Sequence, residues 1–160
     1  VDQAGPAAQS GGLSNPGRQA MAGRRYQLEE QVGHLLRRAH QRATQIFIET
    51  FADSGLTPTQ WAALARLSEE GGASQNHLGR LTAMDPATVQ GVIQRLEKRG
   101  LIDREPDPDD RRRTRLKLTP EGLELVARHS ATGARVSAST LAPLTEAEAA
   151  TFLELLRKLA

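Results

Sequence analysis

The sequence predicts a mainly α-helical fold with one small β-hairpin. Successive helix-start signals, each followed by apolar residues at helical spacing, indicate several amphipathic helices. Two short β-prone segments, residues 101–104 and 114–118, flank the turn-rich residues 106–110 and indicate the hairpin. Aromatic residues make up only 3% of the 160 residues, which favours close-packed helices over an aromatic-rich β-sandwich. The predicted order of elements is ααααββαα.

The helix boundaries follow from capping signals. Thr57-Pro58-Thr59-Gln60 is a capping box with proline at the first helical position, where no hydrogen-bonded amide is lost. Asp85-Pro86 is a second strong start signal. Gly55 ends the long first helix, which we expect to run from Tyr26 to about Ala52. The six helices are expected to begin at Tyr26, Thr57, Ser74, Asp85, Thr119 and Thr145.

We expect residues 1–25 to form a disordered tail. Residues 1–23 are rich in Gly, Ala, Pro, Ser and Gln and show no apolar periodicity, so they cannot bury enough surface to offset the entropy lost on ordering. The apolar periodicity begins at Tyr26. Residues 26–160 are long enough for one domain with its own core.

Composition limits the kind of protein. There are no cysteines, which excludes disulfides, thiolate metal sites and cysteine-based redox sensing. No apolar run approaches the roughly 18 residues that span a bilayer, and the N-terminus lacks the apolar segment of a signal peptide. We therefore expect a cytoplasmic protein with no membrane partner. The four histidines show no i,i+4 pair and no nearby carboxylate cluster, so a metal site is not expected. We expect no cofactor.

Basic residues are concentrated in one part of a nearly neutral chain. The formal net charge is +2, but residues 95–117 contain nine Lys or Arg against six Asp or Glu. A local excess of positive charge favours a polyanionic partner. The alternative interpretation is a solvated surface of mixed charges.

The predicted fourth helix has one apolar and one polar face. The apolar face, expected to pack on the third helix, consists of Val89, Val92, Ile93 and Leu96. The polar face carries Thr88, Gln90, Gln94 and Arg95. Such a face suits the major groove of DNA, where Gln pairs with adenine, Arg with guanine and the Thr methyl with thymine, and free amides at the helix N-terminus can receive a phosphate. Alternatively, it is an ordinary solvated face.

Arginines cluster on the second half of the predicted hairpin. Arg111, Arg112, Arg113 and Arg115 follow a tight acidic turn, and guanidinium groups suit phosphates and narrow minor grooves. Asp109 and Asp110 are expected to orient these arginines by ion pairing. We expect residues 111–113 to contact DNA, together with Ser74 at the start of the third helix. The alternative is a solvated charge run.

These segments resemble the MarR family of bacterial transcription regulators. The similarity rests on LTPTQWAAL (56–64) and LTAMDPATVQGVIQRLEKRGLIDREPDPDDRRRTRLKLTPEG (81–122), with the family's D-R-R hairpin followed by L-T-x-x-G. It implies a winged helix-turn-helix over about 56–119, with residues 86–99 as the recognition helix and the hairpin as a wing. It also implies an obligate homodimer built from helices at about 26–53 and 120–160, which reads a pseudo-palindromic site with half-sites about 10 bp apart.

The end of the chain carries more apolar surface than one subunit is expected to cover. The apolar residues proposed for dimerisation are Leu141, Leu144, Phe152, Leu155, Leu156 and Leu159. The alternative is that they pack within the chain. The family resemblance favours a symmetric interface.

A polar edge on the first helix is a candidate effector site. His34, Arg38 and Gln41 lie at i, i+4 and i+7, beside the apolar stripe and next to His40. A cation with hydrogen-bonding groups suits a planar carboxylate, on whose ring Trp61 could stack. Alternatively, the charges belong to the surface or the dimer interface, and Trp61 belongs to the core.

The resemblance adds a chemical class for this ligand. In MarR-like regulators, aromatic acids and phenolic compounds commonly bind between the first helix and the DNA-binding part and release the DNA. The stretch G-H-L-L-R-R-A (33–39) is similar to regulators of aromatic or N-heteroaromatic acid catabolism. The missing cysteine argues against the thiol-based peroxide sensors of the family.

The function predicted from the sequence is a ligand-responsive repressor that binds double-stranded DNA. An alternative is a winged-helix module for protein interaction or structure, which should expose an apolar patch on the fourth helix. An enzyme is not expected, because no nucleophile with its base, phosphate loop or carboxylate pair stands out.

Overall fold

The computed structural model describes residues 25–108 and 112–160. The chain divides into two units, residues 1–37 and 38–160. The predicted tail, except for its last residue, and the predicted roles of Asp109, Asp110 and Arg111 lie outside the described residues. Within the described ranges, no helix is long and apolar enough to cross a membrane.

The predicted start of the first helix is wrong. Instead of one helix from Tyr26, the structure has a 3-10 turn, η1 (Leu28–Glu30), followed by α2 (Val32–Thr50). Gln27 and Gln31, on either side of η1, have extended backbones, and the Gln31 side-chain amide donates to the Gln27 carbonyl at 2.9 Å. Extended residues interrupt the helical hydrogen bonds, so the apolar periodicity begins before the α-helix does.

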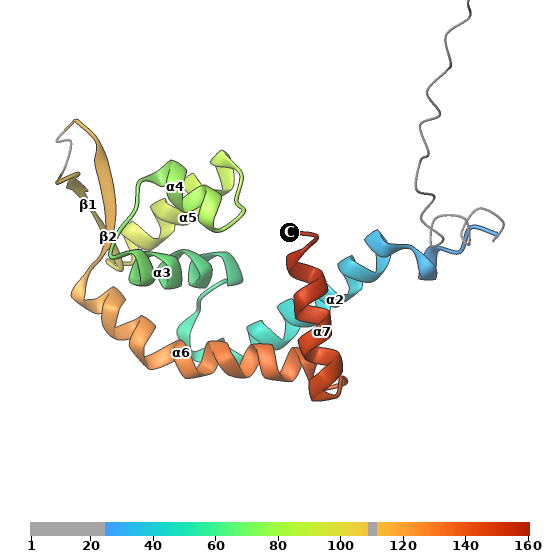
Figure 1. The fold of residues 1–160 in the computed structure, drawn as a ribbon. Coiled ribbons are helices and arrows are strands. Elements are labelled where there is room, and N and C mark those ends of the chain that lie inside the picture. Colours follow the sequence, from blue (N-terminus) through green and yellow to red (C-terminus); the bar gives the residue numbers. More distant parts are fainter. Residues whose placement is uncertain (1–24, 109–111) are drawn as a thin grey trace, which may run out of the picture. The chain divides into compact units, whose positions relative to one another are not determined.

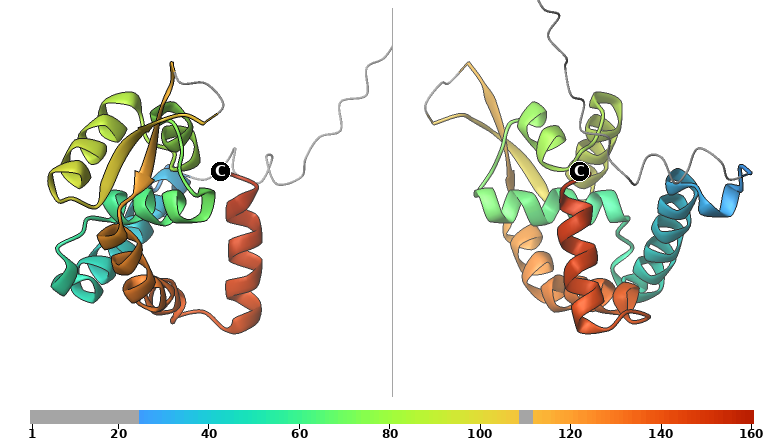
Figure 2. Two further views of the ribbon diagram at one scale, coloured as in Figure 1. Left: turned by 90° about the vertical axis from the view of Figure 1, so that its left-hand side faces the viewer. Right: turned by 45° about the vertical axis from the view of Figure 1, so that its right-hand side comes forward.

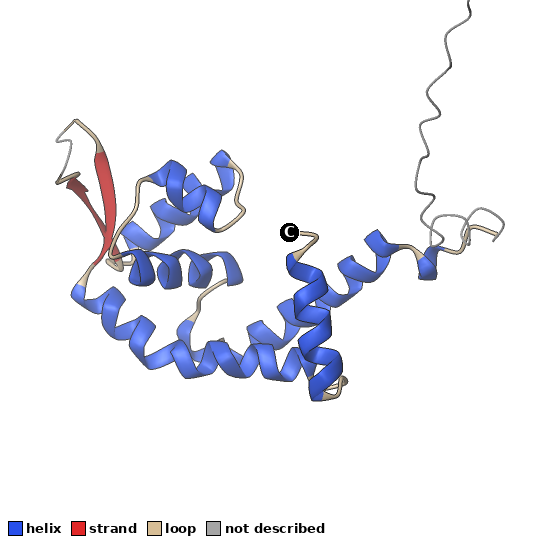
Figure 3. Cartoon of the chain, in the orientation of Figure 1, coloured by secondary structure: helices blue, strands red, loops and turns tan. Residues whose placement is uncertain are grey.

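The predicted order ααααββαα is confirmed, with the two 3-10 turns added (Figures 1 and 3). After α2 comes the second 3-10 turn, η2 (Ala52–Ser54), which is followed by Gly55 with a left-handed φ of 62°. The remaining elements are α3 (Pro58–Glu70), α4 (Gln75–Leu81), α5 (Pro86–Lys98), β1 (Ile102–Pro106), β2 (Thr114–Leu118), α6 (Pro120–Leu141) and α7 (Glu146–Arg157).

The predicted capping signals form the expected hydrogen bonds. Thr57 and Gln60 make the capping box of α3, with Pro58 at its first position. A second box joins Thr145 and Glu148 at the start of α7, where hydrogen bonds from Thr145 lower the pKa of the Glu148 carboxyl. These caps satisfy amides that have no partner inside the helix, so local sequence determines where α3 and α7 begin.

The core lies among α3, α4, α5 and the hairpin, and α3 is at its centre. This helix contacts α4, α5, α6 and β2 (Figure 2). The largest fully buried side chains in and around it include Leu64, Leu67, Leu78, Ile93, Leu96 and Leu116. Burying these side chains stabilises this unit through the hydrophobic effect.

The hairpin is longer than predicted. β1 and β2 pair in antiparallel register from Ile102↔Leu118 to Pro106↔Thr114, so the first strand continues to Pro106. Pro106 is tolerated because it lies at the end of the ladder in a two-stranded sheet. An isolated bridge, Ala73↔Leu116, attaches β2 to the segment that follows α3. We refer to β1, β2 and their connecting loop as the wing.

Candidate nucleic-acid interface

The two faces of α5 are divided as the sequence predicts. Its apolar residues Val89, Val92, Ile93 and Leu96 are all at most 2% exposed. The residues of the polar face, Thr88, Gln90, Gln94 and Arg95, are all exposed. Because the inner face is fixed in the core, the polar side chains project from a well-supported helix.

The N-terminus of α5 is closed by Asp85. One carboxylate oxygen accepts the amides of Ala87 (3.0 Å) and Thr88 (2.9 Å), and the other accepts the Thr88 hydroxyl. The Val89 amide donates to the Asp85 carbonyl, and Pro86 has no N–H. The prediction that free amides at this helix end receive a phosphate is therefore wrong.

This cap also determines what Thr88 can offer to DNA. Hydrogen bonds from the Thr88 side chain and amide lower the pKa of the Asp85 carboxyl, so Asp85 is an anion at neutral pH. Since its hydroxyl is engaged by Asp85, the part of the exposed Thr88 side chain that is left for DNA is its methyl group. A methyl group can contact the thymine methyl in the major groove.

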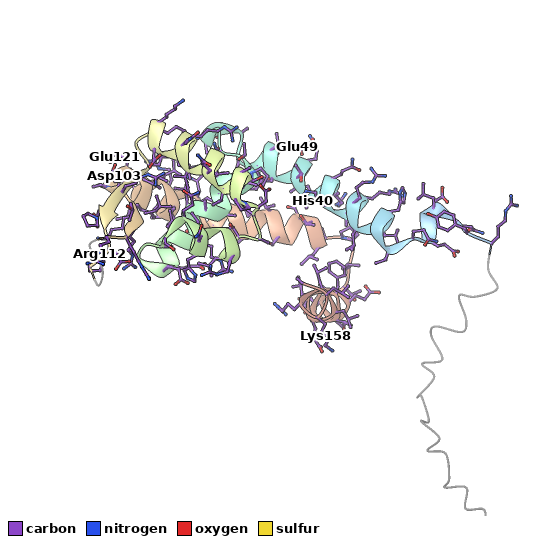
Figure 4. The ribbon with its side chains drawn as sticks, turned by 90° about the horizontal axis from the view of Figure 1, so that it is seen from above. His40, Glu49, Asp103, Arg112, Glu121 and Lys158 are labelled. Carbon is purple, nitrogen blue, oxygen red and sulfur yellow. The ribbon has the colours of Figure 1, made fainter. Side chains whose placement is uncertain are left out.

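The wing supplies exposed arginines. Arg112 and Arg113 are exposed, and Arg112 lies beside the tip of the wing (Figure 4). The Asp107 amide donates to the Arg113 carbonyl at 2.9 Å, which continues the pairing of the two strands toward the tip. Arg111, the third arginine predicted to contact DNA, lies outside the described residues.

Several basic residues of the region 95–117 have partners inside the protein. Arg104 pairs with Glu97 of α5, and Lys117 pairs with Glu105 at 3.2 Å across the wing. Arg99 and Arg115 donate to backbone carbonyl groups. The basic surface is therefore smaller than the count of nine basic residues implies. Arg115 in particular is not an exposed arginine of the wing.

Ser74 has a structural role at the start of α4. Its hydroxyl oxygen accepts the His77 amide at 3.3 Å as the N-cap of that helix. The residue is exposed, so its hydroxyl is at the surface as the predicted DNA contact requires.

The proposed effector residues lie on α2 and α3. In the first unit, His34 Nδ1 lies 3.2 Å from Arg37 Nη2. In the second unit, Arg38, His40 and Gln41 are all exposed on α2. Among the described residues, no cluster of His, Asp and Glu could hold a metal ion.

Trp61 is mainly a packing residue of α3. Its ring centroid lies 5.0 Å from that of Phe51 in a tilted arrangement. A Cβ at Gly133 of α6 would lie 3.1–3.3 Å from three atoms of the indole, so glycine allows the indole to approach the α6 backbone. Trp61 is only partly buried, which leaves some of the indole accessible.

The apolar residues proposed for dimerisation are poorly covered. α7 has no buried residue, and Phe152, Leu155 and Leu159 are 39%, 53% and 72% exposed. Leu144 is also exposed, while Leu141 and Leu156 are half-buried. Most of these apolar side chains are therefore exposed in the described structure.

The helix pair α4–α5 exposes the polar face of α5, whose opposite face is buried in the core, and an arginine-bearing hairpin follows it. This arrangement defines a winged helix-turn-helix DNA-binding protein. The family model of the MarR family matches residues 54–113. The chain is 40% identical over 134 residues to the HTH-type transcriptional repressor NicR of Pseudomonas putida, covering 84% of this chain and 85% of NicR. The chain belongs to the MarR family.

Solved structures support the same assignment. BpsR of Bordetella bronchiseptica, whose DNA binding is regulated by 6-hydroxynicotinic acid, is 43% identical with a TM-score of 0.80, covering 85% of this chain and 97% of that one. A probable transcriptional regulator from Pseudomonas aeruginosa is 48% identical with a TM-score of 0.78, covering 84% of this chain and all of that one. Both similarities extend beyond the wing to the flanking helices.

Proposed function

We propose that this protein is a homodimeric transcriptional repressor that reads DNA with α5 and the wing and releases it when a small aromatic acid binds. The observation that carries the DNA-reading part is the exposed polar face of α5, supported by an inner face that is at most 2% exposed. A rigid helix with Gln and Arg outward can distinguish base pairs in the major groove. A regulator of this kind acts in the cytoplasm.

The relatives support an N-heteroaromatic carboxylate as the effector. NicR is a transcriptional repressor, and 6-hydroxynicotinic acid regulates the DNA binding of BpsR. We extend this ligand class to the present chain, with Arg38 as the proposed partner of the carboxylate. The other residues proposed to line the site are His34, His40, Gln41 and Trp61. Since Trp61 is the only tryptophan, its fluorescence reports ligand binding.

Dimerisation is proposed from the exposed apolar residues of α7 and of the segment that follows it. A monomer would leave Phe152, Leu155 and Leu159 in contact with water, whereas a symmetric interface would bury them. Two α5 helices related by a two-fold axis would then read the two halves of a pseudo-palindromic operator.

An interaction module without DNA binding is less consistent with the structure. Such a module should expose an apolar patch on α5, but the exposed face carries Thr88, Gln90, Gln94 and Arg95. Membership of a family of transcriptional regulators also favours a regulator over an enzyme.

Two substitutions separate the two modes of DNA contact. Gln94→Ala should relax the base preference, because it removes a donor and an acceptor from the face that reads bases. Arg112→Ala should weaken binding to all sequences and reduce the slope of log K against log salt by about 1, because it removes a contact to phosphate. The measurements are selection from a random DNA pool and titrations at several salt concentrations.

Matched controls lie outside the proposed interface. Gln45→Ala on α2 and Arg128→Ala on α6 remove the same side-chain types from exposed positions that pair with Glu49 and Glu124. Both should bind DNA like the wild type. If Gln94→Ala and Arg112→Ala also behave like the wild type, α5 and the wing are not the DNA-reading elements.

A further inference from the structure

We propose that Arg99 and Arg115 are positioning residues that attach the recognition helix and the wing to opposite ends of α3. Both arginines belong to the basic region that the sequence associates with DNA. The structure gives each of them two backbone carbonyl groups as partners instead. This inference rests on the proposed function, because it assumes that α5 and the wing contact DNA.

Arg99 connects the end of α5 to the turn that precedes α3. It is the C-cap residue of α5, and its Nη1 and Nη2 donate to the carbonyls of Gly55 (3.1 Å) and Ser54 (2.9 Å). The planar fork of a guanidinium can bind two acceptors at once in a fixed geometry. Arg99 therefore sets where the C-terminal end of α5 lies relative to the α2–α3 connection.

Arg115 connects the wing to the other end of α3. Its Nη2 donates to the carbonyls of Glu70 (3.2 Å) and Gly72 (2.9 Å), where the negative end of the helix dipole favours a cation. Beside it, Ala73 and Leu116 exchange backbone hydrogen bonds of 3.0 and 2.8 Å. The β2 strand is thus held to the end of α3 by both its backbone and its arginine.

The fit around Arg115 requires glycine at position 72. A Cβ on Gly72 would lie 2.6 Å from Arg115 Nε and 2.8 Å from the Leu116 carbonyl oxygen, and the φ of 122° also disfavours other residues. Arg115 Nε is buried with no hydrogen-bond partner among the described residues. Burying an N–H without a partner costs free energy. The two hydrogen bonds from Nη2 and the packing of the guanidinium offset this cost.

The two attachments share α3 as their base. Because α3 contacts α4, α5, α6 and β2, it is held in place on several sides. Its two ends therefore position the two DNA-contacting elements, α5 and the wing. Losing either arginine should leave the DNA-contacting side chains in place but allow α5 or the wing to change its angle. If α5 or the wing is misplaced, contacts with specific bases are lost before sequence-independent binding to the phosphate backbone is weakened.

The test compares Arg99→Gln and Arg115→Gln with Arg128→Gln, an exposed control on α6. The probe is a short duplex with the site that the wild type selects from a random pool, with a scrambled duplex as the non-specific reference. Each positioning variant should lose about tenfold in affinity for the selected site, with little change for the scrambled duplex or in the salt slope. Arg99→Lys and Arg115→Lys, which keep the charge and a donor but lack the planar fork, should fall in between.

Each outcome decides the proposal. A salt slope reduced by about 1 in a Gln variant would mean that the arginine contacts phosphate, which overturns a positioning role. A lower melting temperature with an unchanged ratio of specific to non-specific affinity would mean a purely structural role and would also overturn it. If a Gln variant does not fold, the same ratio measured on its Lys variant decides. If the wild type selects no sequence, the proposed function fails and this inference fails with it.

Discussion

Replacing Gly122 by alanine should lower the free energy of unfolding by about 3 kcal/mol, the upper part of the range for overpacking in a core. A Cβ at this position would overlap the Leu101 carbonyl oxygen and lie 3.1 Å from the Leu101 carbonyl carbon and 3.4 Å from Leu118 Cδ2. The obstacle is backbone, which cannot rotate away as a side chain can. Thermal or urea denaturation measures the loss.

The surrounding hydrogen bonds prevent a simple adjustment. The Thr119 amide donates to the same Leu101 carbonyl at 3.1 Å, and the Thr119 hydroxyl donates to Gly100 at 2.7 Å. The Gly122 amide donates back to the Thr119 hydroxyl oxygen at 3.1 Å. Moving α6 to accommodate a methyl group would therefore break the junction between the wing and α6. This junction explains the glycine in the L-T-x-x-G motif.

Gly91→Ala is the matched control for this prediction. Gly91 also lies in a helix, but a Cβ there would meet only the Arg95 guanidinium, at 3.6 Å. Removing a helical glycine should stabilise the protein by about 0.5–1 kcal/mol. Equal losses in the two variants would show that the steric account of Gly122 is wrong.

Leu155→Asp should convert the dimer into monomers and weaken operator binding by about 100-fold or more. Leu155 is 53% exposed on α7, and the exposed residues Phe152 and Leu159, the latter just after the helix, lie at helical spacing from it. A carboxylate in a symmetric apolar interface would be buried twice without a partner, at a large cost in free energy. In a dimer, binding of one subunit to its half-site raises the effective concentration of the second subunit at the other half-site. Separated subunits lose this gain. Sedimentation and DNA titration measure the two effects.

Ala150→Asp provides the control on the same helix. Ala150 is exposed and lies about half a helical turn away from the apolar face of α7, so it introduces the same charge outside the proposed interface. It should remain a dimer with wild-type operator affinity. A Leu155→Asp variant that also stays dimeric would remove α7 from the interface.

The helix starts of this fold could be predicted because they depend on local chemistry. The boxes at Thr57 and Thr145 and the Asp85-Pro86 start each involve side chains within three residues of the amides that they cap. The first helix was placed too early, since the apolar periodicity begins at Tyr26 but the backbone at Gln31 is extended. Periodicity reports which residues face the core and does not by itself determine backbone conformation.

The roles of some basic residues could not be predicted because their hydrogen-bond partners are distant in sequence. The sequence shows Arg112 and Arg115 as equivalent members of one cluster, but Arg115 reaches carbonyls that precede it by more than 40 residues. Arg99 likewise binds the distant Ser54 and Gly55. Asp85 is recognisable from sequence as an N-cap, and a capping carboxylate occupies the first amides and so excludes a phosphate, as the structure shows.

The most direct test of the proposed function is a titration of fluorescent operator DNA with the protein at increasing concentrations of 6-hydroxynicotinic acid. Binding of the acid is followed in parallel by Trp61 fluorescence. Operator affinity should fall by at least about tenfold and reach a plateau as the acid saturates, because the ligand must favour the form that does not bind DNA. 2-Hydroxypyridine, which lacks the carboxylate, should have no effect. Unchanged operator affinity at concentrations that saturate the Trp61 signal would contradict the account.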